Sequence, residues 1–281
     1  MIAKLKYYIL HIFHFLDYLA RIPIFYYHLC FNTTVKNQRV DVYSIPVIII
    51  NYNQLFYLKK NVKRLLELGF KNIVIIDNAS SFEPLLDYYE ELDNHKSIFI
   101  ERLEENLGHL VLFKKKELFN KYCKGFYILT DADVVLNEKS PKDIVDLMID
   151  KLIKKHYFLT KIGVALDISD IPDNYPLKDK VLSWENQFWI KQYESDKYFA
   201  DIDTTFALYK PNFYPYKYSN FMKGIRLAGN YSAKHGGWYI LPGDLQEERD
   251  FYFKNNLATS WIYDNDGKLE NNSRNNIYSK D

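Results

Sequence analysis

The 281-residue sequence has few cysteines, few glycines and almost no net charge, and these shortages exclude several classes of protein. Two cysteines, Cys30 and Cys123, cannot form a disulfide framework, so we expect a reducing, cytoplasmic location. Thirty-seven Lys and Arg almost balance 36 Asp and Glu, which leaves no global positive field to attract nucleic acid. Hydrophobic residues make up 48% of the chain, a share that excludes disorder of the whole chain.

The amino-terminal region also lacks a hydrophobic run long enough to cross a membrane. Its longest stretch without Asp, Glu, Lys or Arg lies between Lys6 and Asp17 and has ten residues, whereas a spanning helix needs about 20. No small-residue cleavage site follows, so a secretory signal peptide is not expected. Residues 1–41 instead predict an apolar helix, kinked or interrupted at Pro23. The helix lies either in the plane of the inner membrane surface or against its own domain. Its expected polar face consists of Lys4, His11, His14, Asp17, Arg21 and His28.

Short apolar runs rich in Val and Ile alternate with amphipathic segments from residue 46 onward. The predicted strands begin at residues 46, 72, 97 and 126, at intervals of 26, 25 and 29 residues. Helices are expected at 55–68, through about Leu92, and at 109–122. This spacing is typical of successive β-α-β units in a parallel sheet.

We therefore predict an α/β fold with a Rossmann-like, mostly parallel sheet flanked by helices, in a single domain with an apolar amino-terminal helix. Ligands of such sheets bind beyond the carboxyl ends of the strands. The expected parts are a nucleotide-binding half at 42–136, an acceptor-binding half at 137–262 and a polar tail at 263–281.

The residues that follow the predicted strands suggest the chemistry. Asn51, Tyr52 and Asn53 follow the first strand in place of a G-x-G-x-x-G or P-loop sequence. A dinucleotide dehydrogenase, a glycine-loop methyltransferase and a P-loop nucleotidase are therefore not expected. Asp77 ends the second strand, where it either accepts a hydrogen bond from a ribose or base or caps the next helix.

Two carboxylates follow the fourth strand, in the sequence Asp131-Ala-Asp133. Side chains at this spacing can reach one divalent cation and the diphosphate that it carries. The D-x-D pattern occurs twice more, at 201–203 and 264–266, so the pattern alone is weak. Only the pair at 131–133 follows a buried strand, and this position favours a functional role.

Taken together, these segments resemble the GT-A fold glycosyltransferases, and most closely the family-2-like enzymes that build bacterial capsule and lipopolysaccharide. The resemblance is clear over residues 46–135 and includes a later similarity at 200–209, the strand that closes the acceptor side. It implies a uridine site at Asn51, Tyr52, Asn53 and Asp77, and a nucleotide contact at Asn106 and Gly108. It also implies that Asp131 lies near the ribose and the metal, and that Asp133 and His235 bind Mn²⁺ or Mg²⁺.

One departure from the family leaves the general base uncertain. Many inverting members carry a Glu-Asp pair shortly before the final helix, but no Asp or Glu occurs between Tyr209 and His235. Asp203, expected at the start of a strand, is the first candidate base. Asp201 is expected on the same face of that strand. Glu185 is the second reserve, in the apparent helix start 183–189.

The sequence therefore predicts metal-dependent transfer of a hexosyl or N-acetylhexosaminyl group from a nucleotide sugar, a UDP-sugar, to a glycan or lipid-linked glycan. Inversion is expected from the resemblance. Trp184 and Trp189 either stack on the acceptor or belong to the core. Three alternatives stay open. One is a retaining transferase, which can dispense with a carboxylate base. The others are a nucleotidyltransferase, whose glycine-rich basic loop is missing, and a silent membrane-associated binder of nucleotide sugars or glycans.

Overall fold

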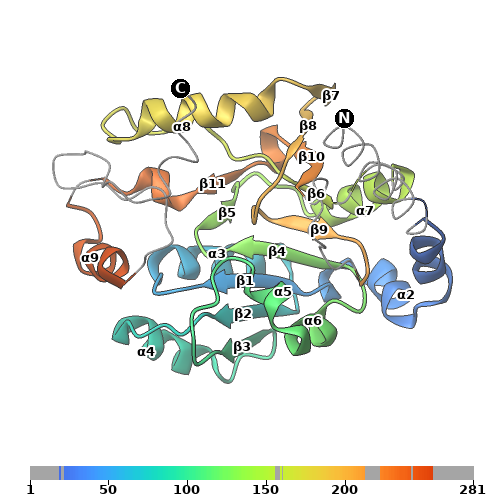
Figure 1. The fold of residues 1–281 in the computed structure, drawn as a ribbon, viewed down its shortest axis with the longest axis horizontal. Coiled ribbons are helices and arrows are strands. Elements are labelled where there is room, and N and C mark those ends of the chain that lie inside the picture. Colours follow the sequence, from blue (N-terminus) through green and yellow to red (C-terminus); the bar gives the residue numbers. More distant parts are fainter. Residues whose placement is uncertain are drawn as a thin grey trace, which may run out of the picture.

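The computed structural model describes Leu19 and residues 22–155, 159, 161–212, 222–241 and 243–255. Within these residues, nine strands form one sheet in the order β3-β2-β1-β4-β9-β6-β10-β8-β7 (Figure 1). All of them run in one direction except β8 and β9. Strands β5 and β11 form a separate antiparallel pair. The predicted α/β fold, with a mostly parallel sheet flanked by helices, is confirmed.

The strands are β1 (Val47–Asn51), β2 (Ile73–Asp77), β3 (Ile98–Arg102), β4 (Tyr127–Asp131), β5 (Val134–Leu136), β6 (Lys161–Val164), β7 (Gln192–Glu194), β8 (Lys197–Asp201), β9 (Ala207–Tyr209), β10 (Lys223–Leu227) and β11 (Ala233–His235). The helices are α2 (Thr33–Val40), α3 (Phe56–Leu68), α4 (Glu83–Leu92), α5 (Val111–Lys114), α6 (Lys116–Tyr122), α7 (Ile144–Lys154), α8 (Lys178–Glu185) and α9 (Gln246–Asn255). Four 3₁₀ turns are η1 (Val42–Ser44), η2 (Asn186–Trp189), η3 (Gly229–Tyr231) and η4 (Gly236–Tyr239).

The first strand is buried on both faces, as its unbroken apolar sequence predicts. Val47 and Ile49 belong to the core that includes α3 and α4. Ile48 and Ile50, which point to the other face, belong to the core that includes α5 and α6. The two-residue period of a strand thus divides the hydrophobic residues between two layers of helices.

The prediction of one continuous helix at 109–122 is wrong, because the segment forms two helices, α5 and α6, separated at Lys115. Lys115 has φ −92° and ψ 90°, outside the helical region. Phe113 and Phe119 lie six residues apart and would point about 120° away from each other on a continuous helix. The break lets both rings enter the same core, with their centroids 6.1 Å apart.

The single strand expected at 200–209 is also wrong. Strand β8 ends at Asp201, and β9 begins only at Ala207. Phe206 has a φ of 41°, in the left-handed region that an extended strand excludes. The two elements occupy different places in the sheet: β8 pairs with β10, whereas β9 lies between β4 and β6.

The amino-terminal region consists of two helical segments in its described part. Residues 22–31 are helical and include Pro23, and the chain then restarts as α2. The break falls at Asn32, whose side chain accepts a hydrogen bond from the Val35 amide and caps α2. Residues 1–18 and the polar tail lie outside the described residues. No helix in the described part is long and apolar enough to cross a membrane.

A lysine is buried inside the sheet. The side chain of Lys161 on β6 has no solvent exposure, and its Nζ donates to the Tyr209 hydroxyl at 2.9 Å. Burial lowers the pKa of Lys161 to about 7, although the charges of Asp203 and Asp201 act in the opposite direction. The folded protein therefore loses this proton at a pH where an unfolded lysine still holds it.

This difference predicts a pH-dependent stability. Between pH 7 and 10 the unfolded chain binds more protons than the native one, so stability should rise with pH. Lys161→Met removes the titrating group at similar volume and should flatten the rise by up to about 1.4 kcal/mol per pH unit. Urea unfolding at several pH values measures this contribution. Equal slopes in the variant and the wild type would contradict it.

Candidate active site

The carboxyl ends of β1, β2 and β4 meet at one edge of the sheet. Asn51 pairs in register with Asp77, and Ile50 pairs with Asp131. The two acidic strand ends therefore lie on either side of β1. This is the edge where ligands of open α/β sheets bind.

Asn51 and Asp77 are both buried and are joined through Tyr89. The Asn51 side-chain amide donates to the Tyr89 hydroxyl at 2.8 Å, and that hydroxyl donates to Asp77 at 3.1 Å. The other Asp77 oxygen accepts from the Ser80 amide at 3.2 Å. Both Asp77 oxygens thus already have protein donors. The hydrogen bonds of Asn51 and Asp77 therefore agree with a role of these two residues in shaping the loop after β2.

Asn53 fastens the loop after β1 to the loop after β2. It adopts a φ of 52°, which asparagine tolerates better than most residues. Its side-chain oxygen accepts from the amides of Ser81 and Phe82, at 2.8 and 3.1 Å. Its own amide donates to the Ser80 hydroxyl at 2.8 Å. Asn53 is fully buried, whereas Tyr52 is partly exposed and donates from its hydroxyl to the Asn255 carbonyl.

Asn78, which the sequence analysis did not single out, holds the third loop against this edge. Its side chain accepts from the Leu107 amide at 2.9 Å and donates to the Gly108 carbonyl at 3.2 Å. Asn106 closes the turn by accepting from the Gly108 amide at 2.8 Å. Gly108 has a φ of 77°, which favours glycine. The predicted nucleotide contacts Asn106 and Gly108 therefore lie next to the end of β2.

Asp131 is held at the end of β4 by Thr204. The threonine hydroxyl donates to the Asp131 carboxylate, and the Asp131 amide donates to the Thr204 carbonyl at 3.0 Å. Burial raises the pKa of Asp131 well above its ordinary value, and the neighbouring charges of Asp133 and Asp203 add to the shift. The Thr204 hydrogen bond opposes it. The ionised form of Asp131 is therefore unfavourable, and a bound cation would stabilise it.

The pairing of β5 with β11 brings His235 beside Asp133. His235 pairs in register with Val134, and the Gly236 amide donates to the Asp133 carbonyl at 2.7 Å. The His235 Nδ1 atom lies 3.5 Å from an Asp133 carboxylate oxygen. This Nδ1 is buried, and the described residues offer it no hydrogen-bond partner within normal geometry.

Trp238 and two glycines fix the orientation of the histidine ring. Trp238 stacks on His235 with a centroid distance of 4.7 Å and an interplanar angle of 13°. A Cβ on Gly237 would lie 3.2 Å from the imidazole, and a Cβ on Gly236 would lie 2.4 Å from the Tyr57 ring. The missing side chains let the backbone approach both rings and keep the space beside Asp133 open.

Asp131, Asp133 and His235 offer oxygen and nitrogen ligands that suit Mn²⁺ or Mg²⁺. Within the described residues, no group of three or more His, Cys, Asp or Glu side chains is placed to hold a metal ion by itself. Mg²⁺ is commonly held by one or two carboxylates together with substrate phosphates and water. The His235 Nδ1 atom has no hydrogen-bond partner in the part of the chain that the structure describes, and the ionised form of Asp131 is unfavourable. Both observations are compatible with a cation that binds here together with a diphosphate.

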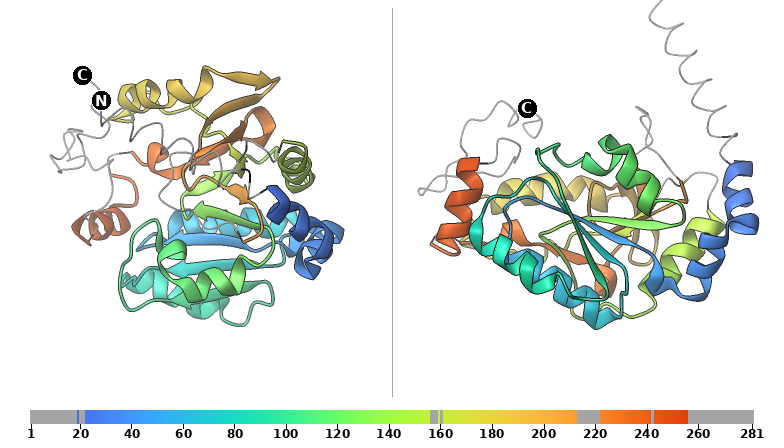
Figure 2. Two further views of the ribbon diagram at one scale, coloured as in Figure 1. Left: turned by 45° about the vertical axis from the view of Figure 1, so that its right-hand side comes forward. Right: turned by 90° about the horizontal axis from the view of Figure 1, so that it is seen from below.

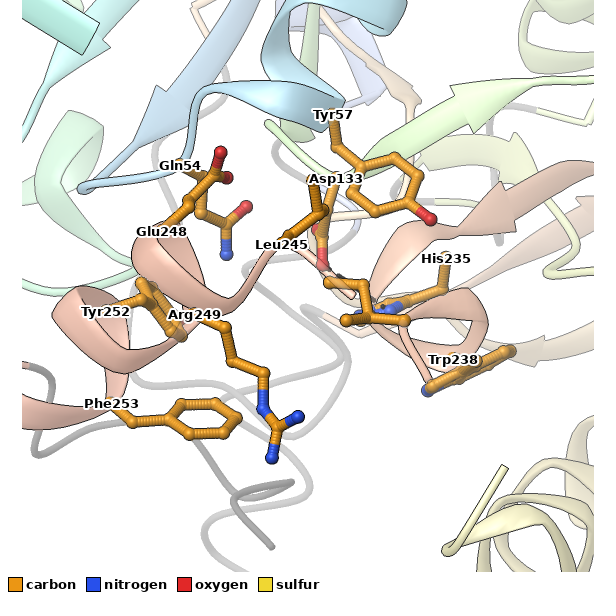
Figure 3. Close-up of a pocket in the computed structure, with 12 residues that line it drawn as sticks. Gln54, Tyr57, Asp133, His235, Trp238, Leu245, Glu248, Arg249, Tyr252 and Phe253 are labelled. Atoms are coloured by element: carbon orange, nitrogen blue, oxygen red, sulfur yellow. Dashed lines mark ion pairs between the residues drawn. The ribbon is translucent and has the colours of Figure 1, made fainter. Parts of the chain in front are cut away.

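A cavity of about 90 Å³ opens beside Asp133 and His235 (Figure 3). Its opposite wall is α9, which contributes Glu248, Arg249, Tyr252 and Phe253. Tyr57 lies beside Asp133 and His235 (Figure 3), and its pKa is raised to about 12 by burial and by nearby acidic groups, of which Asp133 is the strongest. The cavity therefore has a carboxylate that can face a cation on this side and the positive charge of Arg249 on the α9 side.

Glu248 attaches α9 to the start of α3. Its carboxylate accepts from the amides of Leu55 and Phe56 at distances of 2.9 to 3.2 Å. Residue Leu55 itself provides no side-chain cap, so Glu248, almost 200 residues later, satisfies these amides instead. The sequence analysis missed α9, because a short acidic segment gives no local sign of a distant capping role.

Glu185 is engaged in a buried ion pair. It lies at the end of α8 and not at the predicted helix start, and it is only 3% exposed. Its carboxylate lies 2.8 Å from Arg226, whose guanidinium group packs 4.0 Å from the Phe188 ring centroid. Burial raises the pKa of Glu185, and Arg226 opposes the shift. Releasing this carboxylate would leave Arg226 buried without its partner, so the pair fits a structural role better than that of a base.

Asp201 and Asp203 do not share the face of one strand as predicted. Asp201 ends β8 and forms an ion pair with Lys223 at 2.6 Å. Asp203 is exposed in the loop before β9, one residue ahead of the Thr204 that binds Asp131. The charge of Asp203 contributes to the raised pKa of Asp131, so the two carboxylates are electrostatic neighbours.

Trp184 lies at the end of α8, and Trp189 lies in η2 (Asn186–Trp189). Both are partly exposed. Trp184 contacts Phe188 edge to face at 6.0 Å, and Trp189 contacts Tyr198 at 5.0 Å. These contacts give each indole an aromatic neighbour without burying it completely.

The Glu248 cap leads to a stability prediction. Glu248→Ala should lower the free energy of unfolding by about 1 kcal/mol, because two amides at the start of α3 lose their carboxylate acceptor. Glu247→Ala, at the exposed neighbouring position on α9, is the matched control and should change little. Urea unfolding of both variants measures the difference, and equal losses would show that the cap contributes nothing.

Comparisons with known proteins find likeness only among solved structures. No family model matches the chain, and neither does any curated protein. The mannosyltransferase PcManGT from Pyrobaculum calidifontis, solved with GDP-Man and Mn²⁺, is 12% identical with a TM-score of 0.43, over 73% of this chain and 59% of that one. S. aureus TarS 1–349 is 14% identical with a TM-score of 0.41, over 75% and 65%. GalNAc-T7, solved with UDP, GalNAc and Mn²⁺, is 15% identical with a TM-score of 0.42, over 68% and 43%. The chain spans less than two thirds of each of these three chains.

Proposed function

We propose that the chain is a glycosyltransferase of the GT-A type that uses a divalent metal and a nucleotide-sugar donor. The observation that carries the proposal is the position of His235, whose Nδ1 lies 3.5 Å from the Asp133 carboxylate, next to the Asp131 that ends β4 at the carboxyl edge of the sheet. The donor we propose is a UDP-sugar, from which a hexosyl or N-acetylhexosaminyl group passes with inversion to a glycan or lipid-linked glycan. We place this activity in capsule or lipopolysaccharide synthesis, on the cytoplasmic side of the membrane.

Asp133 and His235 would hold a Mn²⁺ or Mg²⁺ ion, with Asp131 alongside. The bound cation would supply positive charge next to the diphosphate leaving group. Burial raises the pKa of Asp131 and so disfavours its ionised form. A cation bound nearby would stabilise the ionised carboxylate. Trp238 would orient the His235 ring for this role by stacking on it.

The three loops at the carboxyl edge would hold the nucleotide. Asn51, Asn53 and Asp77 are buried, and their hydrogen bonds fix the shape of the loops. Tyr52 and Asn106 remain partly or fully exposed at the same edge and are available for direct contact. The predicted uridine site therefore divides into residues that shape the loops and residues that touch the ligand.

Asp203 is the best-placed candidate for the base that removes the acceptor proton. It is exposed, and within the described residues it forms no ion pair, unlike Glu185 and Asp201. The Thr204 hydrogen bond to Asp131 holds its loop next to the proposed donor. Proton removal by a positioned carboxylate typically contributes a factor of about 10² to 10⁴ in rate.

A donor screen tests the function directly. The full chain is incubated with Mn²⁺, glycan acceptors and a panel of UDP- and GDP-sugars, and nucleotide release is measured. We expect release from one UDP-sugar, and NMR of the product should show an inverted anomeric centre. A retained configuration would make the chain a retaining transferase. Binding without release across the panel would make it a nucleotide-sugar-binding protein and would contradict the proposal.

The metal assignment predicts a coupled stabilisation. UDP with saturating Mn²⁺ should raise the melting temperature of the wild type by about 5 °C, because a ligand at 100-fold its Kd adds about 2.7 kcal/mol. Asp133→Asn should lose this shift while keeping the fold, whereas Asp87→Asn, at an exposed position on α4, should keep it. Thermal unfolding measures all three proteins. An undiminished shift in Asp133→Asn would refute the assignment.

The proposed base predicts a kinetic signature. Asp203→Asn should lower kcat by about 100-fold or more, with little change in the KM for the donor, because the carboxylate acts on the acceptor hydroxyl. Asp201→Asn is the matched control two residues away and should retain most of kcat. Steady-state rates of nucleotide release decide between them. Full kcat in Asp203→Asn would move the role to another carboxylate.

A further inference from the structure

The amino-terminal helical segment shows apolar side chains to solvent as well as to the core. Eight large hydrophobic residues are exposed in the described part of the chain, and six of them lie between residues 19 and 40. They are Leu19, Ile24, Tyr26, Tyr27, Phe31 and Val40. A helix that is apolar all round is normally buried on all sides. A concentration of exposed apolar side chains of this kind marks a candidate contact surface.

The inner face of the segment is firmly attached to the domain, so the outer face is a fixed surface. Phe25 is buried and meets the Phe126 ring edge to face at 6.4 Å. In α2, the Gln38 side chain both donates to and accepts from the Phe126 backbone, at 2.9 and 2.8 Å. A Cβ on Gly125 would lie 2.2 Å from Gln38, so glycine is required for this close approach.

The outer face is formed by Ile24, Tyr27 and Phe31, which are 54%, 60% and 68% exposed. Spacings of three and four residues place these side chains along one side of the helix. The rings of Tyr27 and Phe31 lie 5.5 Å apart and form a continuous aromatic patch. Of the residues expected on a polar face, only His28 lies in the described part of the chain. It is half-buried and is hydrogen-bonded to the Asn32 side chain. The side toward solvent is apolar.

Positive charge accompanies this outer face. Residues 1–40 contain five Lys and Arg against one Asp, whereas the whole chain contains 37 against 36 Asp and Glu. Lys36 and Arg39 are exposed on α2, directly after the aromatic patch. Aromatic and aliphatic side chains bordered by basic ones suit the interface of a bilayer that carries anionic lipids. A second copy of the chain would bring the same positive charge and be repelled.

We propose that Ile24, Tyr27 and Phe31, with Lys36 and Arg39, form a surface that binds anionic membranes from one side. Residues 22–40 lie at the opposite end of the molecule from α9 (Figure 2), the helix that lines the cavity. Lipid binding is therefore separable from catalysis, and it does not depend on the proposed transferase function. The partner is a lipid surface in which the aromatic side chains enter the headgroup region and the basic side chains meet lipid phosphates.

Flotation of the full chain with vesicles tests the proposal, without donor or metal. Wild type should float with phosphatidylcholine vesicles that contain phosphatidylglycerol. The variant Ile24→Ser/Tyr27→Ser/Phe31→Ser should lose at least tenfold in partitioning. Lys36→Ala/Arg39→Ala should lose about fivefold per charge on these vesicles and nothing on neutral ones. Phe99→Ser/Ile190→Ser removes the other two exposed hydrophobic residues of the described part and is the matched control.

Three results would overturn the proposal. The first is wild-type protein that stays out of the vesicle fraction. The second is partitioning of the serine variant that equals that of the wild type or of the control. The third is a dimer, detected by light scattering after gel filtration, that the serine substitutions dissociate, since the surface would then bind a second copy. Circular dichroism of each variant, together with an unchanged urea unfolding transition, checks that the changes at these exposed positions leave the fold intact.

Discussion

The pairing of β5 with β11 is the contact on which the candidate site depends. It joins the turn after β4 to a segment 100 residues later and sets His235 3.5 Å from Asp133. The pairing is short, so neighbouring contacts must support it: the Gly236 amide binds the Asp133 carbonyl, and Trp238 stacks on the histidine. Without this pair of strands, Asp131 and Asp133 would end a parallel sheet without a nitrogen ligand nearby.

Electrostatics explain why this arrangement points to a charged ligand. Asp131 carries a raised pKa because it is buried next to two other carboxylates, and only the Thr204 hydroxyl offsets this. Such a cluster is unfavourable in a protein without a bound cation. Among the other described residues, buried Glu185 is paired with Arg226, and the buried amine of Lys161, whose pKa is lowered by burial, donates to the Tyr209 hydroxyl. The raised pKa of Asp131 therefore agrees with the cation that we propose at the carboxyl edge.

The sequence predicted the first half of the fold well because its signals there are local. Runs of Val and Ile with regular spacing define four strands, and the polar residues at their ends follow from the register. The second half depends on contacts between distant residues. Glu248 caps a helix almost 200 positions earlier, and the segment expected as one strand is interrupted between Asp201 and Ala207, where Phe206 has a φ of 41°. Periodicity carries no information about such contacts, so α9 and the Arg226 ion pair were missed.

The central claim is that the strand-end carboxylates and His235 share a cation with a nucleotide diphosphate. A crystal structure with UDP and Mn²⁺, recorded at the manganese absorption edge, tests it most directly. We predict an anomalous peak in contact with an Asp133 oxygen and the His235 ring, at metal–ligand distances of about 2.0–2.3 Å. A nucleotide bound at the carboxyl edge with no manganese peak beside Asp133, or a peak at another place on the molecule, would contradict the account.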